Sequence, residues 1–467
     1  MERTTVIAEA QLQAQKEICR QIKEYWQEKG IVPCAFVDTY GCQQNEADSE
    51  RIRGMLQDCG YTMTDTEEGA DCIVLNTCAI REHAEQRVFG NVGALVHTKR
   101  RHEGQKIFLC GCMMGQEHAA KKIKSSYTHV DGVFNPHHLW RFPELLQQVL
   151  LTGKRVFAVE NEAGNIAEGI PVVRQNKLKA WVSIMYGCNN FCSYCIVPYV
   201  RGRERSRRPE EIIKEVRELI AQGYKDITLL GQNVNSYGKD LGLGIDFADL
   251  LDTLAQLEGD FWLRFMTSHP KDATKKLFDV MAKHPKIAKQ FHLPFQSGND
   301  RVLKEMNRRY TSGQYLELVN YGRSVMPGLI LTSDVIVGFP GETDEEFEDT
   351  IRLIETVRYD ALFTFIYSPR KGTPAAEMPD PATKQDKNRR FDKLVDTQNR
   401  ISEQIHRSYI GTTVTVLADG REGDVLTSRT EGGRLVRFKG SDDLIGSFVK
   451  VRITDCTTWS LVGELAE

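Results

Sequence analysis

Three closely spaced cysteines are the strongest chemical signal in this sequence. They stand in Cys188-Asn-Asn-Phe-Cys192-Ser-Tyr-Cys195, with three and then two residues between them. Three thiolates on one loop can hold three irons of a four-iron cluster and leave the fourth iron open to a chelating ligand. The alternative is a structural zinc site, but that takes four closed ligands. Because no fourth Cys or His stands nearby in the sequence, the spacing favours an iron–sulfur cluster.

A second set of cysteines is dispersed. Cys42 lies in Thr-Tyr-Gly-Cys-Gln-Gln-Asn, Cys78 in Asn-Thr-Cys-Ala-Ile-Arg and Cys112 in Cys-Gly-Cys-Met-Met-Gly, each just past a predicted strand. Loops that follow parallel strands leave from one edge of the sheet, so these thiols can converge there. Cys110 falls inside an apolar run, whereas Cys112 follows a glycine that allows a turn, and we therefore choose Cys112. We expect the remaining cysteines to be buried and inert, as single cysteines usually are; they are Cys19, Cys34, Cys59, Cys72 and Cys456.

Short apolar runs alternating with helical stretches predict the fold class, which is α/β. Runs at 35–39, 72–76, 107–110 and 130–134 predict strands of an N-terminal parallel α/β sheet. Six further strands, at 180–185, 227–230, 262–267, 291–295, 331–337 and 362–367, predict a partial (β/α)6 barrel. After a charged helix at 384–407, five short strands at 413–418, 425–430, 434–438, 448–453 and 459–462 predict a small β-barrel.

Length, charge and cysteine content limit the class of protein. The 467 residues suffice for two or three domains, and a net charge of -3 means that a nucleic-acid partner would need a local basic patch. No run approaches the roughly 18 apolar residues of a membrane span, and acidic Glu9 and Glu17 stand where a signal sequence would be basic or apolar. We expect a cytoplasmic protein with no membrane partner. The 12 cysteines then favour metal binding or catalysis over disulfides.

The first cysteine motif, with aromatic Tyr194 directly before its last cysteine, resembles the signature of radical S-adenosylmethionine (SAM) enzymes. With both cysteine sets, the chain from about Cys34 onward is similar to the methylthiotransferase family. That resemblance implies a cluster domain at 32–160, a radical-SAM core at 179–408 and a C-terminal TRAM domain at 409–467. The polar helical pattern at 1–31 predicts an N-terminal extension, and the polar stretch with Gly and Pro at 161–178 predicts a linker. Several motifs resemble the branch of the family that acts on isopentenyladenosine in tRNA. They are Thr267-Ser268-His269-Pro270, Leu293-Pro294-Phe295-Gln296-Ser297-Gly298 and Met306-Asn307-Arg308-Arg309-Tyr310-Thr311.

The resemblance implies two 4Fe-4S clusters with different tasks and two molecules of SAM. Cys42, Cys78 and Cys112 would hold an auxiliary cluster that carries the sulfur to be inserted. Cys188, Cys192 and Cys195 would hold the other cluster, whose open iron would bind the amino and carboxylate groups of SAM. Reductive cleavage of a C–S bond of SAM would then give a 5′-deoxyadenosyl radical. Chemistry at an aromatic C–H bond comes from such a cofactor, so no acid or base residue is assigned.

Loops at the carboxyl ends of barrel strands are the expected SAM contacts, because active sites of barrels cluster there. Ordinary loop turns are the alternative for these segments. Arg308 and Arg309 are weaker candidates, since such arginines are more often solvated. The residues assigned to SAM binding are Tyr194, Gly231, Gln232, Asn233, Ser268, Gly338, Phe339 and Pro340.

The implied partner is the anticodon stem-loop of a tRNA whose adenosine carries an isopentenyl group. Five arginines between Tyr199 and Pro209 are suited to its phosphates, although a solvated charge run is the alternative. They are Arg201, Arg203, Arg205, Arg207 and Arg208. The C-terminal tail, with seven Lys/Arg against nine Asp/Glu, is not basic.

An electron donor such as flavodoxin or ferredoxin and a monomeric state complete the expectation. Two competing interpretations stay open. The first is methylthiolation of another target, either threonylcarbamoyl-adenosine in tRNA or a ribosomal protein. The second is a non-catalytic iron–sulfur protein that binds RNA or transfers electrons.

Overall fold

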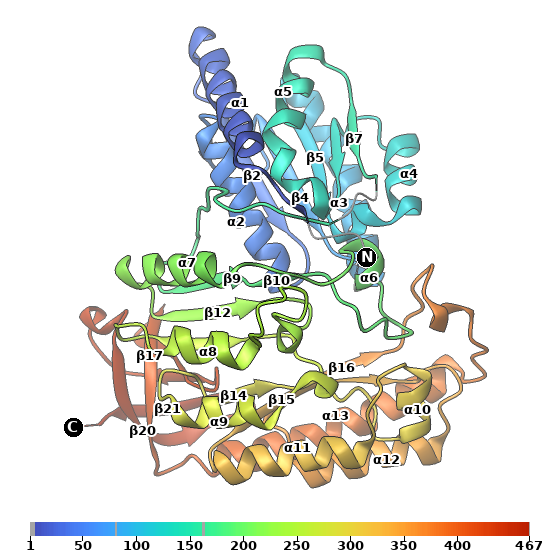
Figure 1. The fold of residues 1–467 in the computed structure, drawn as a ribbon, viewed down its shortest axis with the longest axis vertical. Helices are drawn as coiled ribbons and strands as arrows, with labels where there is room; N and C mark the ends of the chain where they lie inside the picture. The colour runs from blue at the N-terminus through green and yellow to red at the C-terminus, as the bar shows by residue number, and fades with distance from the viewer. Residues whose placement is uncertain (1–4, 80–81, 161–163, 467) are drawn as a thin grey trace. The chain divides into compact units, whose positions relative to one another are not determined.

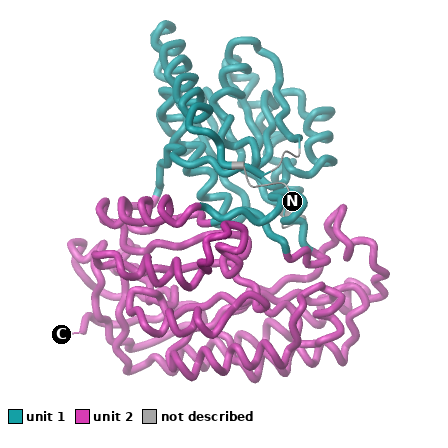
Figure 2. The backbone as a smooth tube through the Cα atoms, viewed as in Figure 1, with its two compact units in different colours: residues 1–175, 185–189, 195–207 teal, residues 176–184, 190–194, 208–467 magenta. Residues whose placement is uncertain are grey.

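The computed structural model of the protein describes residues 5–79, 82–160 and 164–466. The chain forms two compact units (Figure 2): unit 1 comprises residues 1–175, 185–189 and 195–207, and unit 2 comprises residues 176–184, 190–194 and 208–467. The segment with the first cysteine motif is shared between them, with Cys188 and Cys195 in unit 1 and Cys192 in unit 2. Ile80 and Arg81 of the Cys78 motif, and the first three residues of the expected linker, lie outside the described residues.

Unit 1 is built on a six-stranded parallel sheet, as expected, in the order β3-β2-β4-β5-β6-β7. Figure 1 labels β2, β4, β5 and β7 of this sheet. Its strands are β2 (Cys34–Thr39), β3 (Thr62–Met63), β4 (Cys72–Thr77), β5 (Lys106–Gly111), β6 (Gly132–Phe134) and β7 (Val156–Ala158). The sequence did not reveal β3 and β7, because two or three residues are too few to show a period. The connecting helices are α2 (Gln43–Asp58), α3 (Glu82–Arg101), α4 (Glu117–Ser126) and α5 (Phe142–Thr152).

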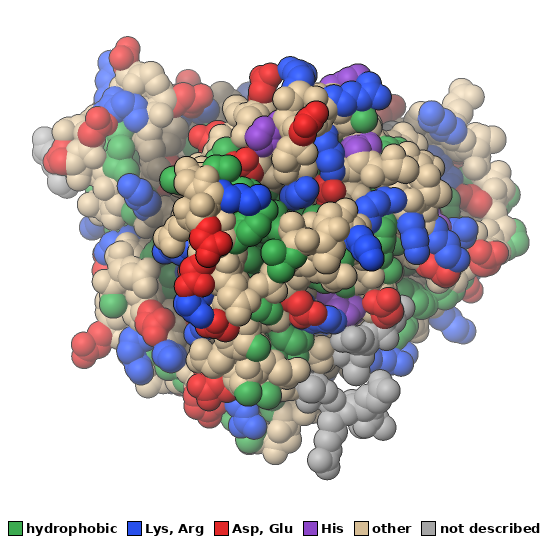
Figure 3. Space-filling model, turned by 90° about the horizontal axis from the view of Figure 1, so that it is seen from above, with side chains coloured by type: hydrophobic (Ala, Val, Ile, Leu, Met, Phe, Trp, Pro, Cys, Tyr) green, Lys and Arg blue, Asp and Glu red, His purple; other side chains and the backbone are tan. Residues whose placement is uncertain are grey.

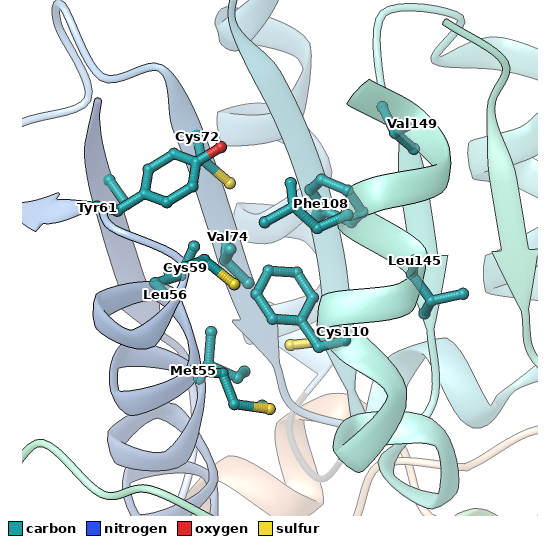
Figure 4. Close-up of a cluster of buried hydrophobic side chains, with 14 of the residues drawn as sticks. Met55, Leu56, Cys59, Tyr61, Cys72, Val74, Phe108, Cys110, Leu145 and Val149 are labelled. Atoms are coloured by element: carbon teal, nitrogen blue, oxygen red, sulfur yellow. The ribbon is translucent and has the colours of Figure 1, made fainter. Parts of the chain in front are cut away.

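Both faces of this sheet are covered, which explains the consecutive apolar residues in the central strands β4 and β5. On one face Leu56 of α2 and Leu145 of α5 pack against Val74, Phe108 and other sheet residues in a continuous core (Figure 4). A second core forms between the sheet and helices α3 and α4. The strands are therefore fixed from both sides, and the loops at their carboxyl ends are held in place.

The N-terminal segment packs into the core of unit 1, whereas the sequence predicted a separate extension. Helix α1 (Glu9–Glu28) buries Cys19, Ile22 and Trp26 in the same core as α2 and α5. Strand β1 (Thr5–Val6) pairs in parallel with β8 (Asn165–Ile166), which lies in the expected linker. The polar composition hid these contacts, because only one narrow stripe of the helix is apolar.

Unit 2 contains the expected partial barrel. Two three-stranded parallel sheets, β9-β12-β13 and β14-β15-β16, are joined by an isolated parallel bridge between Leu263 and Ile287. The strands are β9 (Lys179–Ser183), β12 (Asp226–Leu230), β13 (Trp262–Phe265), β14 (Gln290–His292), β15 (Ile330–Val337) and β16 (Ala361–Ile366). The helices between them are α7 (Pro209–Ala221), α8 (Phe247–Ala255), α9 (Lys275–Lys283), α10 (Asp300–Glu305), α11 (Ser312–Val325) and α12 (Asp344–Val357).

After α13 (Lys384–Arg407), the C-terminal strands close into the small barrel that the sequence predicts. They are β17 (Thr413–Glu422), β18 (Val425–Thr430), β19 (Leu435–Phe438), β20 (Phe448–Cys456) and β21 (Ser460–Leu465). Alternate residues such as Val416, Leu426 and Val436 fill its interior.

Side chains of both signs are interspersed over the face that Figure 3 shows. Among the described residues, no helix has the length and apolar character needed to cross a membrane.

Candidate metal centres

The three dispersed cysteines follow three adjacent strands of the unit 1 sheet at their carboxyl ends. Cys42 precedes α2 after β2, Cys78 follows β4, and Cys112 begins a short 3-10 helix, η1 (Cys112–Gly115), after β5. Burial raises the pKa of the Cys112 thiol to about 12; the guanidinium of Arg201 opposes the shift, and the Cys78 and Cys42 thiols add to it. The structure therefore brings the three thiols within electrostatic reach of one another.

Two glycines permit this close approach. Gly111, directly before Cys112, has φ +92°, and a Cβ there would lie 2.3 Å from the carbonyl oxygen of Thr77. Gly41, directly before Cys42, has φ +131°, and its Cβ would lie 2.7 Å from that of Cys78. Only glycine fits both the backbone conformation and the space.

The side chain of Asn45 ties the cysteine-bearing loops together. It is fully buried, and its Nδ2 donates to the carbonyl oxygens of Tyr40 (2.9 Å) and Thr77 (3.0 Å), which precede Cys42 and Cys78. Sequence reasoning did not single out Asn45, although its position three residues after Cys42 in a polar helix start was a usable signal.

Arg201 completes the cluster of side chains at this edge of the sheet. Its Nε donates to Sγ of Cys112 at 3.0 Å, and its Nη2 donates to Oδ1 of Asn45 and Oδ2 of Asp48, both at 2.8 Å. The site thus combines soft thiol ligands with a buried cation that can offset the negative charge of thiolates.

Cys110 has different surroundings from Cys112. Its side chain lies in the apolar core between α2 and α5 (Figure 4), and burial raises its pKa well above the ordinary value. Successive side chains of a strand point to opposite faces, so the final residues of β5 direct Cys110 into the core before the turn at Gly111 redirects the chain.

The loop of the first cysteine motif is anchored in unit 1 at both of its ends. β10 (Met185–Tyr186) pairs antiparallel with β11 (Arg205–Ser206), and the amide of Cys188 donates to the carbonyl oxygen of Gly202 at 3.1 Å. The short helix α6 (Val197–Val200) follows Cys195. The region on either side of the motif is therefore a closed hairpin-like loop.

Cys192 and Tyr194, in unit 2, contact a second buried arginine. Nη1 of Arg308 lies 3.5 Å from Sγ of Cys192 and 3.4 Å from the hydroxyl of Tyr194, and Nη2 donates to the carbonyl oxygen of Pro294 at 2.6 Å. Arg308 is 4% exposed, so the expectation of a solvated side chain does not hold for it. Each cysteine set thus has one buried guanidinium on a sulfur.

His269 also faces Cys192, with its Nε2 4.0 Å from the sulfur. Its Nδ1 accepts from the backbone amide of Lys271 at 3.2 Å, which leaves the proton on Nε2. Burial and the nearby Arg308 guanidinium lower the pKa of His269 well below its ordinary value, so this imidazole is neutral.

The loops expected to contact SAM lie at the carboxyl ends of β12, β13 and β15. Gly231, Gln232 and Asn233 follow β12, Ser268 lies three residues after β13, and Gly338, Phe339 and Pro340 follow β15. Two buried polar atoms here, Oδ1 of Asn233 and Oγ of Ser268, have no hydrogen-bond partner within the described part of the chain. Such atoms fit a polar ligand. By contrast, the Phe339 side chain packs in a core cluster with Tyr194 and Tyr367.

The structure corrects the expectation for three of the five arginines. Arg201 (4% exposed), Arg205 (6%) and Arg207 (5%) are buried in protein contacts, which leaves them no free surface for RNA phosphates. Arg205 donates to the carbonyl oxygens of Arg201 and Arg203, and Arg207 pairs with Glu168. Arg203 and Arg208 are exposed. The sequence did not reveal this difference, because it depends on how the segment packs within unit 1, where Arg205, Ser206 and Arg207 are all buried.

Within the described ranges, no three His, Cys, Asp or Glu side chains are placed to share one metal ion. A four-iron cluster has a different requirement, because each thiolate binds its own iron across the cube.

Comparison with known proteins covers nearly the whole chain. The chain matches the models of the Radical SAM superfamily over residues 182–354, of an uncharacterized protein family, UPF0004, over residues 34–135, and of the TRAM domain over residues 407–466. It is 48% identical over 465 residues to the tRNA-2-methylthio-N(6)-dimethylallyladenosine synthase of Alkaliphilus oremlandii, covering 99% of this chain and 98% of the relative. The synthase of the same name from Thermoanaerobacter sp. (strain X514) is 47% identical over 464 residues, with the same coverage.

A solved structure supports the fold. The radical S-adenosylmethionine methyltransferase TsrM from Kitasatospora setae, with cobalamin and a [4Fe-4S] cluster bound, superposes with a TM-score of 0.55 at 13% identity over 74% of each chain. At this identity the likeness concerns the fold alone.

Proposed function

This chain belongs to the methylthiotransferase family of radical-SAM enzymes, in the branch of the tRNA-2-methylthio-N(6)-dimethylallyladenosine synthases, and on that premise we propose that two sets of three cysteines carry its reaction. The enzyme adds a methylthio group to ring carbon 2 of an isopentenyl (dimethylallyl) adenosine next to the tRNA anticodon. One SAM molecule supplies the methyl group and a second supplies the radical.

Cys42, Cys78 and Cys112 hold the auxiliary cluster in this proposal. The observation that carries it is the convergence of three cysteine loops on the fully buried amide of Asn45. Its Nδ2 donates to the carbonyl oxygens of Tyr40 and Thr77, which precede Cys42 and Cys78, and its Oδ1 lies 3.9 Å from Sγ of Cys112. A thiol with a pKa near 12 is protonated at neutral pH, so iron binding must displace its proton. When bound, the cluster supplies the sulfur that the reaction inserts.

Cys188, Cys192 and Cys195 hold the cluster that binds SAM. When bound, it supplies the electron that opens a C–S bond of SAM. The protein contributes position and electrostatics: Arg308 and neutral His269 face the sulfur of Cys192, and hydrogen bonds to cluster sulfurs tune reduction potential. The unpartnered atoms of Asn233 and Ser268 would receive polar groups of SAM.

The target adenosine lies in a single-stranded loop, so it can be turned out without opening a duplex. Exposed Arg203 and Arg208 remain as phosphate contacts near the first cysteine motif. The β-barrel has more acidic than basic residues, which argues against a purely electrostatic grip by that domain. A cytoplasmic monomer reduced by flavodoxin or ferredoxin completes the proposal.

The test is a reaction of anaerobically reconstituted protein with SAM, a reductant and an anticodon stem-loop that carries isopentenyladenosine, followed by mass analysis of the nucleosides. The same stem-loop without the isopentenyl group is the substrate control. C112A and C110A form a matched pair of variants, because only the first removes a proposed ligand.

A methylthio adduct together with 5′-deoxyadenosine is expected, and C112A should abolish the adduct while 5′-deoxyadenosine still forms. Formation of 5′-deoxyadenosine without any adduct would refute the assignment of isopentenyladenosine as the substrate. It would favour threonylcarbamoyl-adenosine in tRNA or a ribosomal protein as the target. If neither product forms from protein with both clusters, the result favours a non-catalytic iron–sulfur protein.

A further inference from the structure

Arg201 is a charged side chain buried against a proposed cluster ligand, where no RNA phosphate can reach it. We propose that it is a positioning residue of the auxiliary cluster, which holds the Cys112 sulfur in place and stabilises the negative charge of the reduced cluster. This inference rests on the proposed function, since it concerns the cluster of Cys42, Cys78 and Cys112.

The geometry at the sulfur is specific. Nε of Arg201 donates to Sγ of Cys112 at 3.0 Å, while Nη2 is fixed by Asn45 and Asp48 at 2.8 Å each. The guanidinium is planar, so these contacts on two edges determine its orientation. A lysine could supply the charge, but it could not place two N–H donors, as Nε and Nη2 do, in one fixed plane.

Packing brings Arg201 to the sulfur through the short helix α6. Ile196 and Val200 of this segment pack with Ala79 and Cys112 in one buried cluster. The contact is close, because a Cβ at Gly115 would lie 3.1 Å from Cβ of Val200. The segment that begins at the ligand Cys195 therefore supplies the cation of the other cysteine set, and both belong to unit 1.

The charge balance explains why a cation is kept there. Arg201 is 4% exposed, its Nη2 lies 2.8 Å from the Asp48 carboxylate, and its Nε lies 3.0 Å from the Cys112 sulfur. Burying a cation is costly unless it is paired, and one carboxylate partner leaves it able to pair with thiolate charge as well. Hydrogen bonds and positive charge at cluster sulfurs favour the reduced state.

The test isolates the auxiliary cluster in the full-length variant C188A/C192A/C195A, reconstituted with iron and sulfide. Its midpoint potential is measured by a redox titration followed by EPR spectroscopy, alone and with R201Q, R201K or the control R207Q added. Arg207 is also a buried, ion-paired arginine, but its pairing is with Glu168. We expect a negative shift for R201Q, a smaller one for R201K and no shift for R207Q.

D48N provides a second measurement with the opposite sign. It removes the negative charge beside Arg201, so the potential should shift positive, whereas general loosening of the site would move D48N and R201Q alike. This comparison keeps the proposal testable if R201Q loses its cluster.

An unchanged potential in R201Q, or a negative shift in D48N, overturns the role of Arg201 and leaves the proposed function standing. A C188A/C192A/C195A protein that binds no iron–sulfur cluster overturns the assignment of the auxiliary ligands, and this inference with it.

Discussion

Gly111→Ala is expected to destabilise unit 1, because Gly111 makes the turn between β5 and Cys112. The backbone there has φ +92°, which L side chains rarely adopt. An added Cβ would lie 2.3 Å from the carbonyl oxygen of Thr77, 2.4 Å from Oδ1 of Asn76 and 2.7 Å from the Thr77 nitrogen. These atoms belong to β4 and cannot move without disturbing the sheet.

The expected loss follows from two separate costs. Holding a non-glycine residue in this backbone region costs about 1 to 3 kcal/mol. Forcing a methyl group into close-packed surroundings costs about 1 to 3 kcal/mol more. The free energy of unfolding should therefore fall by about 2 to 6 kcal/mol. For a unit of this size each kcal/mol lowers the unfolding temperature by about 2 to 4 °C.

Gly90→Ala is the matched control, since it is the same substitution in the same unit. Gly90 lies exposed within α3 with nothing within 4 Å of an added Cβ, so alanine there should stabilise by about 0.5 to 1 kcal/mol. Differential scanning calorimetry of the metal-free proteins measures both shifts. If the unfolding temperature of Gly111→Ala equals that of the unsubstituted protein, the steric reasoning at this turn is wrong.

Three further outcomes test other parts of the structure. Cys112→Ser should lose roughly half of the iron bound by the reconstituted protein, as measured by iron analysis. Cys110→Ser should retain the iron but lose about 1 to 3 kcal/mol of stability in denaturant unfolding, because it places a hydroxyl in the apolar core. If Cys110 were the ligand, the two variants would show the reverse. Arg203→Ala with Arg208→Ala should reduce the slope of log affinity against log salt for tRNA by about 2, and an unchanged slope would remove them as phosphate contacts. Burial and the nearby Arg205 guanidinium lower the pKa of His137 to about 4 from an ordinary 6.5, so its neutral form is favoured in the folded state. Its contribution is present above pH 6.5 and is lost as the pH falls toward 4, by about 3 kcal/mol; unfolding titrations of His137→Asn should lack this part of the pH dependence.

Strand patterns and cysteine spacing were predictable because both are local. The β2, β4 and β5 strands and the six barrel strands show as apolar runs, and parallel topology then dictates that Cys42, Cys78 and Cys112 leave one edge of a sheet. Helix α1 was visible as a helix, but its place in the core of unit 1 was not. A polar helix with a narrow apolar stripe carries no information about which neighbour covers that stripe.

The sequence by itself determined the thiols, their order along the chain and the fold class that gathers them. Only the tertiary structure decided what the arginines do. Arg201, Arg203 and Arg205 are the same residue type in the sequence, yet Arg201 and Arg205 are buried against different partners while Arg203 is exposed, because the packing of the segment within unit 1 sets which side chains it covers. It also decided the part of Asn45, whose hydrogen bonds join residues 5 and 32 positions away. Such contacts depend on how distant strands are packed, and no local pattern records them.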